Sequence, residues 1–257
     1  MSGFGVLVRK ELLEAWRTRR LPVIAVLFVV VGIMSPLTAR YLNEILKAAL
    51  GDQLPMILPE PTAAMAIEQI QKNLGQLGAL AAIALAMGSV ASELDRGTAA
   101  LVLAQPATRP AFLLAKLVGM AVVLGACTAA AMGVAWVYTA ILFEALPIGG
   151  FLVFAVLSWL ALFAWAALTF LASTVTGSVT AAAGLGFVAL IGVSLVAVVP
   201  ALDRVLPTGL AAPAALFAAG KASGVDGGSL VTALVGTVVL VAGCAALAIA
   251  AFRRREL

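Results

Sequence analysis

The chain has 257 residues, of which 63% are hydrophobic and 11% are charged, and its formal net charge is +4. Soluble domains carry about 25% charged residues, so the composition excludes an ordinary soluble domain and indicates a polytopic helical membrane protein. The chain contains no histidine, which excludes Ser–His catalysis, imidazole proton relays and histidine metal sites. We therefore expect no catalytic, cofactor-binding or metal-binding residue on this chain, and no nucleic-acid partner.

Residues 1–20 form a basic, amphipathic opening. Apolar side chains recur there at every fourth position: Phe4, Val8, Leu12 and Trp16. This spacing predicts an interfacial helix that lies along the cytoplasmic surface of the membrane. The alternative is a charged extension that only orients the first span.

Six apolar runs are long enough to cross a membrane, which takes about 20 residues of helix. They are residues 21–37, 74–90, 117–143, 150–172, 179–199 and 230–252. Together they predict an all-α membrane protein with six transmembrane helices in a single domain, residues 1–257. No Asp, Glu, Lys or Arg lies inside these runs. Because charged groups inside a membrane usually mark ion pathways or proton relays, their absence argues against a proton-driven carrier.

The connecting segments set the orientation of the spans. Six spans place both termini on one side, and cytoplasmic termini put most of the basic residues inside: Arg9, Lys10, Arg17, Arg19, Arg20, Arg96, Arg109, Lys116 and Arg253 to Arg255. This distribution matches the positive-inside rule. Residues 40–73 and 200–228 are then extracytoplasmic, and they either bind an outer partner or gate an exit, or simply cap the outer face. Residues 173–178 are predicted to form a short uncharged turn.

The charged segment 91–110 is predicted to lie in the cytoplasm. Ser92 is placed to cap a helix, and the acidic residues Glu93 and Asp95 in its first turn favour the positive end of the helix dipole. Gly97 then permits a sharp change of direction.

A second short helix is expected to follow. Thr98 is placed to cap it, and Pro106 ends it. Its apolar residues, Leu101 to Leu103, have no evident core to enter. The segment is therefore either a loop lying among lipid headgroups or a helix that docks into a groove on a cytoplasmic partner.

Three stretches in register resemble ABC-2 type transporter permeases. The pattern Glu93-x-x-x-Gly97-Thr98, then Pro106-x-x-Arg109-x-x-Phe112-x-x-x-Lys116, resembles the cytoplasmic loop of that family. The stretch RKELLEAWRTRR, residues 9–20, is similar to its N-terminal helix, and FRRREL, residues 252–257, is similar to its basic C-terminus. The chain departs from the family at Thr108-Arg109-Pro110, where Ser-Arg without the proline is more typical.

The resemblance implies a type V exporter-like ABC-2 fold in the cytoplasmic membrane of a bacterium. The partners it implies are two P-loop ATPase subunits and a second permease, either a copy of this chain or a homologue. The chain has no G-x-x-x-x-G-K-[ST] loop, so ATP and Mg would bind on the partner ATPase. Membrane lipid surrounds the spans.

The resemblance also implies the functional residues. Those expected to contact the ATPase are Lys10, Glu11, Glu93, Asp95, Arg96, Gly97, Thr98, Leu101, Val102, Pro106 and Arg109. Those expected to line the transport path or a dimer contact are Ser89, Gly184 and Gly186. For the small residues, the alternative is ordinary helix packing within the chain.

Two other functions stay open on the sequence alone. One is an ATP-independent secondary carrier or channel, and the other is a non-transporting membrane anchor of a partner complex. An uncharged path suits an amphipathic or lipid-like cargo.

Overall fold

The computed structural model describes residues 3–50, 60–97 and 108–254 of the chain. Helices account for nearly all of this part, and it contains no strand. The predicted all-α class is therefore confirmed. The predicted residues Thr98, Leu101, Val102 and Pro106 lie outside the described ranges.

Six helices in the described part are long and apolar enough to cross a membrane, as the sequence predicted. They are α2 (Arg20–Arg40), the unit Ala63–Asp95, α8 (Arg109–Leu142), α9 (Ile148–Thr176), α10 (Val179–Val196) and α13 (Gly227–Arg253). The shorter helices are α1 (Gly3–Arg17), α3 (Leu42–Leu50), α11 (Pro200–Asp203), η2 (Pro207–Leu210), α12 (Ala211–Ala218) and η3 (Ala222–Gly224).

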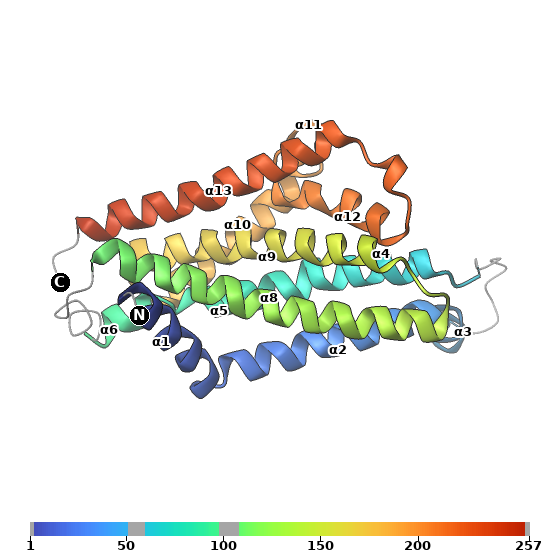
Figure 1. Cartoon of the computed structure of the whole chain (residues 1–257), viewed down its shortest axis with the longest axis horizontal. Coiled ribbons are helices and arrows are strands. Elements are labelled where there is room, and N and C mark those ends of the chain that lie inside the picture. Colours follow the sequence, from blue (N-terminus) through green and yellow to red (C-terminus); the bar gives the residue numbers. More distant parts are fainter. Residues whose placement is uncertain (1–2, 51–59, 98–107, 255–257) are drawn as a thin grey trace.

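Helix α9 lies at the centre of the bundle (Figure 1) and contacts the most neighbours, namely α5, α8, α10, α12 and α13. Helix α8 packs between α9 and α2, and α1 lies across α8 at one end. We call this the α1 end; the C-terminal end of α13 and the start of α8 also lie there. The opposite end, where α12 folds back against α9, is called the α12 end.

The second spanning unit is longer than the predicted run 74–90. It comprises α4 (Ala63–Asn73), a π-helical turn η1 (Leu74–Gly78), α5 (Ala79–Met87) and α6 (Ala91–Asp95). Its start therefore lies within the segment 40–73, where the side chain of Thr62 caps α4 by accepting from the Met65 amide. The sequence TAAMAIEQIQKN, residues 62–73, is typical of a helix, and α4 confirms it. Hydropathy did not include this helix in the second span because its exposed face is polar, whereas its buried face packs on α2.

Glycines shape both ends of α9. The helix continues to Thr176, through most of the predicted turn 173–178, and ends at Gly177, whose φ of 67° suits a residue without a side chain. At the other end, a Cβ on Gly150 would overlap the backbone carbonyl of Phe217. The absence of a side chain at Gly150 therefore lets α12 pack directly against α9.

Candidate functional site

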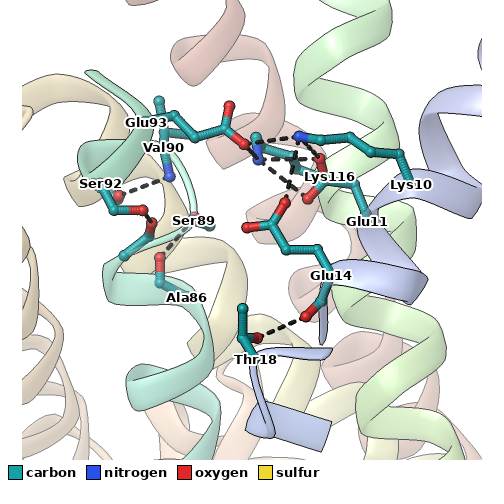
Figure 2. Close-up of polar contacts among 12 residues, drawn as sticks. Lys10, Glu11, Glu14, Thr18, Ala86, Ser89, Val90, Ser92, Glu93 and Lys116 are labelled. Carbon is teal, nitrogen blue, oxygen red and sulfur yellow. Dashed lines mark hydrogen bonds and ion pairs between the residues drawn. The ribbon is translucent and has the colours of Figure 1, made fainter. Parts of the chain in front are cut away.

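Three helices bring five charged side chains together at the α1 end (Figure 2). Helix α1 contributes Lys10, Glu11 and Glu14, α6 contributes Glu93, and α8 contributes Lys116. We call this group the ion-pair cluster. It joins parts of the chain that are more than 80 residues apart, and its member Glu93 lies in α6, close to Gly97, where this described range ends.

Lys116 is the centre of the ion-pair cluster. Its side chain is only 2% exposed, and its Nζ donates to Glu93 Oε1 at 2.8 Å and to both carboxylate oxygens of Glu11 at 3.1 Å. The ammonium also lies 5.0 Å from the ring centroid of Phe112, a cation–π distance. A buried ammonium is tolerated only when it is paired and hydrogen-bonded, and this lysine meets both conditions.

Lys10 joins the carboxylates from the solvent side. Its Nζ lies 2.9 Å from Glu93 Oε1, 3.1 Å from Glu11 Oε1 and 3.4 Å from Glu14 Oε2. Burial alone would lower the pKa of Lys10, but the hydrogen bond to Glu93 and the attraction of the Glu11 and Glu93 carboxylates outweigh it. Together they raise the pKa above its ordinary value. Lys10 therefore stays charged at physiological pH.

The three carboxylates could in principle share a cation, because oxygens of Glu11, Glu14 and Glu93 lie within 4.8 Å of one another. The positions between them are filled by the ammonium groups of Lys10 and Lys116. A third basic side chain, Arg20, lines a small cavity of about 40 Å³ beside the cluster. The cluster therefore connects the helices through ion pairs, and the lysine ammonium groups occupy the positions that a metal ion would take.

The helix is interrupted just before α6, and Ser173 of α9 forms hydrogen bonds with the backbone groups at this interruption. Residues Gly88 to Val90 form turns between α5 and α6. The Ser173 hydroxyl donates to the Met87 carbonyl at 2.8 Å and accepts from the amides of Val90 and Ala91 at 3.3 and 3.0 Å. Helix α6 is thereby fixed to α9 as well as to α8.

Ser92 does not cap α6, so that prediction was wrong. The helix begins at Ala91, and the Ser92 hydroxyl donates to the carbonyl of Gly88. Gly97 follows with a φ of 67°, which agrees with the expected change of direction. The acidic residue in the first turn of α6 is Glu93, which points toward Lys116 (Figure 2).

Helix α1 packs closely on α8 through its inward face. A Cβ on Gly119 would lie 3.0 Å from Glu11 Cβ, so the glycine allows the close approach. Two members of the predicted apolar stripe face outward instead, with Phe4 39% and Trp16 63% exposed. The inward face is centred on Glu11 and Ala15, and the outward apolar residues remain available to lipid.

The whole described bundle can now be compared with known proteins. The model of the family described as ABC-2 family transporter protein matches residues 6–257. The chain belongs to the ABC-2 transporter family. A curated relative from Bacillus subtilis (strain 168), the "uncharacterized transmembrane protein YxlG", is 30% identical over 146 residues. That match covers 56% of this chain and 57% of the relative.

Family membership makes this chain a multi-pass membrane component of an ABC transporter, in a family of permeases that are generally non-catalytic. The match over nearly the whole length agrees with the resemblance noted in the three sequence stretches. The spanning helices of this ABC-2 protein are those described above.

The predicted ATPase-facing residues separate into two groups in the ABC-2 protein. Asp95, Arg96 and Gly97 are exposed at the end of α6, whereas Glu93 is 8% exposed and held by two lysines. Arg109 lies at the start of α8, where Nη1 donates to the carbonyls of Phe252 and Arg253 at 3.2 and 3.1 Å. It thus satisfies two C-terminal carbonyls of α13, as basic residues often do.

The predicted path-lining residues are also separated by the fold. Gly186 is buried, and a Cβ there would meet Ile83 and Thr169, so this glycine serves packing within the chain. Ser89 is 9% exposed and its hydroxyl donates to the Ala86 carbonyl at 2.7 Å. Gly184 lies on the exposed face of α10, where an added Cβ would meet no atom of the described residues within 4 Å.

Sequence reasoning missed three residues that build this region: Lys116, Glu14 and Ser173. Lys116 was counted among the cytoplasmic basic residues and in the family pattern but was not named as a site residue, because the predicted run 117–143 begins one residue later. Its helix in fact starts at Arg109, so the lysine lies in the second turn. The signal was available, since a lysine at the edge of an apolar run needs carboxylate partners, and Glu11 and Glu93 are among the few acidic residues of the chain.

Proposed function

We propose that this chain is the permease subunit of an ATP-driven exporter, in which two permeases pair with two P-loop ATPase subunits. ATP and Mg would bind on the ATPases, because this chain has no phosphate-binding loop. In this arrangement the α1 end lies in the cytoplasm of a bacterial cell and the chain lies in its cytoplasmic membrane. Support for this orientation comes from the basic residues at the α1 end, which follow the positive-inside rule.

The ion-pair cluster is the observation that carries the proposal. Segment 98–107 follows α6 in the sequence, and α6 is fixed to α8 through Glu93 and Lys116 and to α9 through Ser173. A force applied to that segment would therefore move three helices together instead of bending one loop. Rigid attachment of this kind is what coupling between ATPase closure and a transport path requires.

The exposed residues at the end of α6 are the proposed ATPase contacts. Asp95, Arg96 and Gly97 face away from the bundle, and Thr98, Leu101, Val102 and Pro106 continue the same segment. Glu93, Lys10 and Glu11 have a different role in this proposal: they hold the contact surface in place. Arg109 ties the start of α8 to the end of α13.

A second permease is expected to cover part of α10. Only 11% of the apolar window of this helix is buried within the chain, the lowest share among the six described spanning helices. Gly184 lies on the exposed side and permits close helix approach. Cross-linking of Gly184→Cys, in a background with Cys127 and Cys244 replaced by alanine, would test whether two copies meet there.

Co-purification tests the central part of the proposal. The tagged full-length chain is extracted from its native membrane in mild detergent, and its partners are identified by mass spectrometry and assayed for ATPase activity. We expect a stoichiometric P-loop ATPase, and about tenfold less of it with Arg96→Glu, since charged contacts at an interface contribute on the order of 1–3 kcal/mol. Lys47→Glu on the exposed surface of α3 is the matched charge reversal at the other end.

Three outcomes would contradict parts of the proposal. A chain that purifies without any ATPase, and that supports flux in liposomes without ATP, would be a secondary carrier or channel. A chain that binds a partner through segment 98–107 without substrate-dependent ATPase activity would be an anchor. Equal loss of the ATPase with Arg96→Glu and Lys47→Glu would move the contact away from α6.

A further inference from the structure

A half-open cavity of about 290 Å³ lies toward the α12 end of the bundle, away from the ion-pair cluster. It is bounded by the π-helical turn η1, by α9 and α10, and by the folded-back segment of η2 and α12. Its apolar walls include Leu157, Leu162, Trp165 and Leu210, each at most 5% exposed. Ligand pockets commonly have volumes of about 300–1,000 Å³ and combine apolar walls with a few polar groups.

Two polar atoms in the cavity wall lack hydrogen-bond partners. Within the described ranges, Gln71 Oε1 and Ser158 Oγ are buried and make no hydrogen bond, and both residues line this cavity. Thr128 Oγ1 shares this property but does not line the cavity. A buried polar group without a partner is destabilising, so a ligand that supplies the missing partner gains affinity.

The hydroxyl of Ser158 does not bond within its own helix, unlike most other buried hydroxyls of the spanning helices. Five other buried hydroxyls on the spanning helices donate to the carbonyl four residues earlier: Ser35, Thr139, Thr169, Thr174 and Thr237. Ser194 lines the same cavity and also bonds this way, to Leu190. Ser158 is 5% exposed and does not, so this residue of the cavity wall keeps an unused hydrogen-bonding group.

The π-helical turn contributes to the same wall. Leu74, Gly75 and Gln76 of η1 line the cavity, and single π turns inside longer helices occur frequently at functional sites. The cavity also adjoins a groove of about 500 Å³ between α4 and α12, with which it shares Gln71, Lys72 and Ala211. The cavity and the groove therefore lie on either side of the same residues of α4 and α12.

We propose that this cavity binds an apolar molecule that carries a hydroxyl group, with the hydroxyl placed between Gln71 and Ser158. The ligand hydroxyl donates to Gln71 Oε1 and accepts from Ser158 Oγ, so both free hydrogen-bonding atoms are satisfied. Its apolar part packs against Trp165 and the surrounding leucines. This site belongs to a single chain, so its occupation does not depend on the ATPase of the proposed function.

Photolabelling of the purified full-length chain in lipid nanodiscs tests this assignment. The probe is a long-chain alcohol that carries a diazirine and a terminal alkyne, and the matched probe is its methyl ether, which cannot donate a hydrogen bond. We expect the alcohol to label residues 71–76 or 157–165, the unlabelled alcohol to compete, and the ether to label there about tenfold less. One hydrogen bond inside an apolar site supports a difference of that size.

Two variants separate the cavity from the surrounding lipid. Ser158→Ala is expected to reduce saturable labelling about tenfold, whereas Ser194→Ala, whose hydroxyl is already bonded within its own helix, keeps it within about twofold. Each variant is accepted only if its unfolding midpoint is not lower than that of the wild-type chain. Equal labelling by alcohol and ether, or labelling confined to the lipid-facing surfaces of α10 and α13, would overturn the proposal and leave the cavity to water.

Because neither probe requires ATP or a partner, failure of this test would leave the exporter proposal intact. Conversely, a chain that purifies without an ATPase would still be expected to bind the alcohol.

Discussion

Buried polar groups are hydrogen-bonded between helices at one end of the bundle and left without partners toward the other, as two serines of α9 show. At the α1 end, Ser173 of α9 makes three hydrogen bonds to the backbone before α6. Toward the α12 end, Ser158 of the same helix makes none that the described residues provide. The α1 end thus uses its polar groups to fix helices together, whereas the other end keeps hydrogen-bonding capacity free inside a cavity.

The largest effect is expected where the α1 end depends on a buried charge. Lys116→Met leaves the carboxylates of Glu11 and Glu93 without their central cation, while Lys10 remains on the solvent side. Removing one partner of a buried ion pair costs about 3–5 kcal/mol, so we expect a much lower unfolding midpoint in detergent. Lys47→Met, at an exposed lysine of α3, should leave the midpoint unchanged.

A second substitution shows whether the loss comes from the ion pair. If Glu93→Gln is added to Lys116→Met, one of the two carboxylates that had lost their central cation disappears, and part of the stability should return. Directly interacting residues show coupling energies of about 0.5–3 kcal/mol in such double-mutant cycles. Additive losses from the two single variants would mean that Lys116 acts through packing on Phe112 instead.

The serine comparison gives the next largest effect. Ser173→Ala removes the partner of the Val90 and Ala91 amides and should cost about 1–3 kcal/mol of folding free energy, since buried backbone donors lose their acceptor. Ser158→Ala removes a hydroxyl that has no described partner, so the unfolding midpoint in the absence of ligand should stay the same or rise. Thermal unfolding of both variants in one detergent measures the difference, and equal losses would remove the contrast between the two ends.

Two neighbouring glycines of α9 test how close packing, without ion pairs, holds α12 against α9. Gly150→Ala forces a methyl group against the Phe217 carbonyl and should cost about 1–3 kcal/mol through displacement of α12. Gly149→Ala, one residue earlier in α9, meets nothing within 4 Å and should be neutral or slightly stabilising. The measurement is the unfolding midpoint together with protease sensitivity of residues 207–218. A similar response of both variants would show that α12 is not packed as closely as described.

Periodicity and hydropathy predicted the elements of this fold better than its contacts. The six spans are long, apolar runs, and length and composition alone identify such runs as membrane-spanning helices. The extension of the second span to Ala63 was missed because α4 is amphipathic and packs on α2 through contacts distant in sequence. Ser92 was misassigned because a cap depends on where the helix begins, and a hydroxyl can instead bond to a carbonyl of the preceding turn.

The candidate site was predictable in its members but not in its pairing. The family resemblance nominated Glu11, Glu93 and Lys10 as contacts to the ATPase, and charged residues outside a span are usually exposed. Their burial depends on Lys116 and on the close approach of α1 at Gly119, which no local pattern reports. Gln71 and Ser158 gave no signal at all, since neutral polar residues in apolar helices normally bond within their own helix.

The smallest expected effect lies at the start of α13, where Asp226 caps the helix. Its carboxylate accepts from the amides of Gly228 and Ser229 at 3.1 and 3.2 Å, and these bonds hold the pKa of Asp226 below its ordinary value. A lowered carboxyl pKa means that the stabilisation is present above the unfolded-state pKa and is lost as the pH falls through the folded-state pKa. Asp226→Ala should therefore speed hydrogen exchange in the first turn of α13 at neutral pH, and the difference from wild type should shrink toward strongly acidic pH. Asp226→Asn keeps an acceptor and should protect the same amides without this pH dependence. Faster exchange along the whole of α13 in Asp226→Ala would mean that the cap stabilises the entire helix. A charged group would then stabilise this end of the bundle as well, which would contradict the contrast with the α1 end.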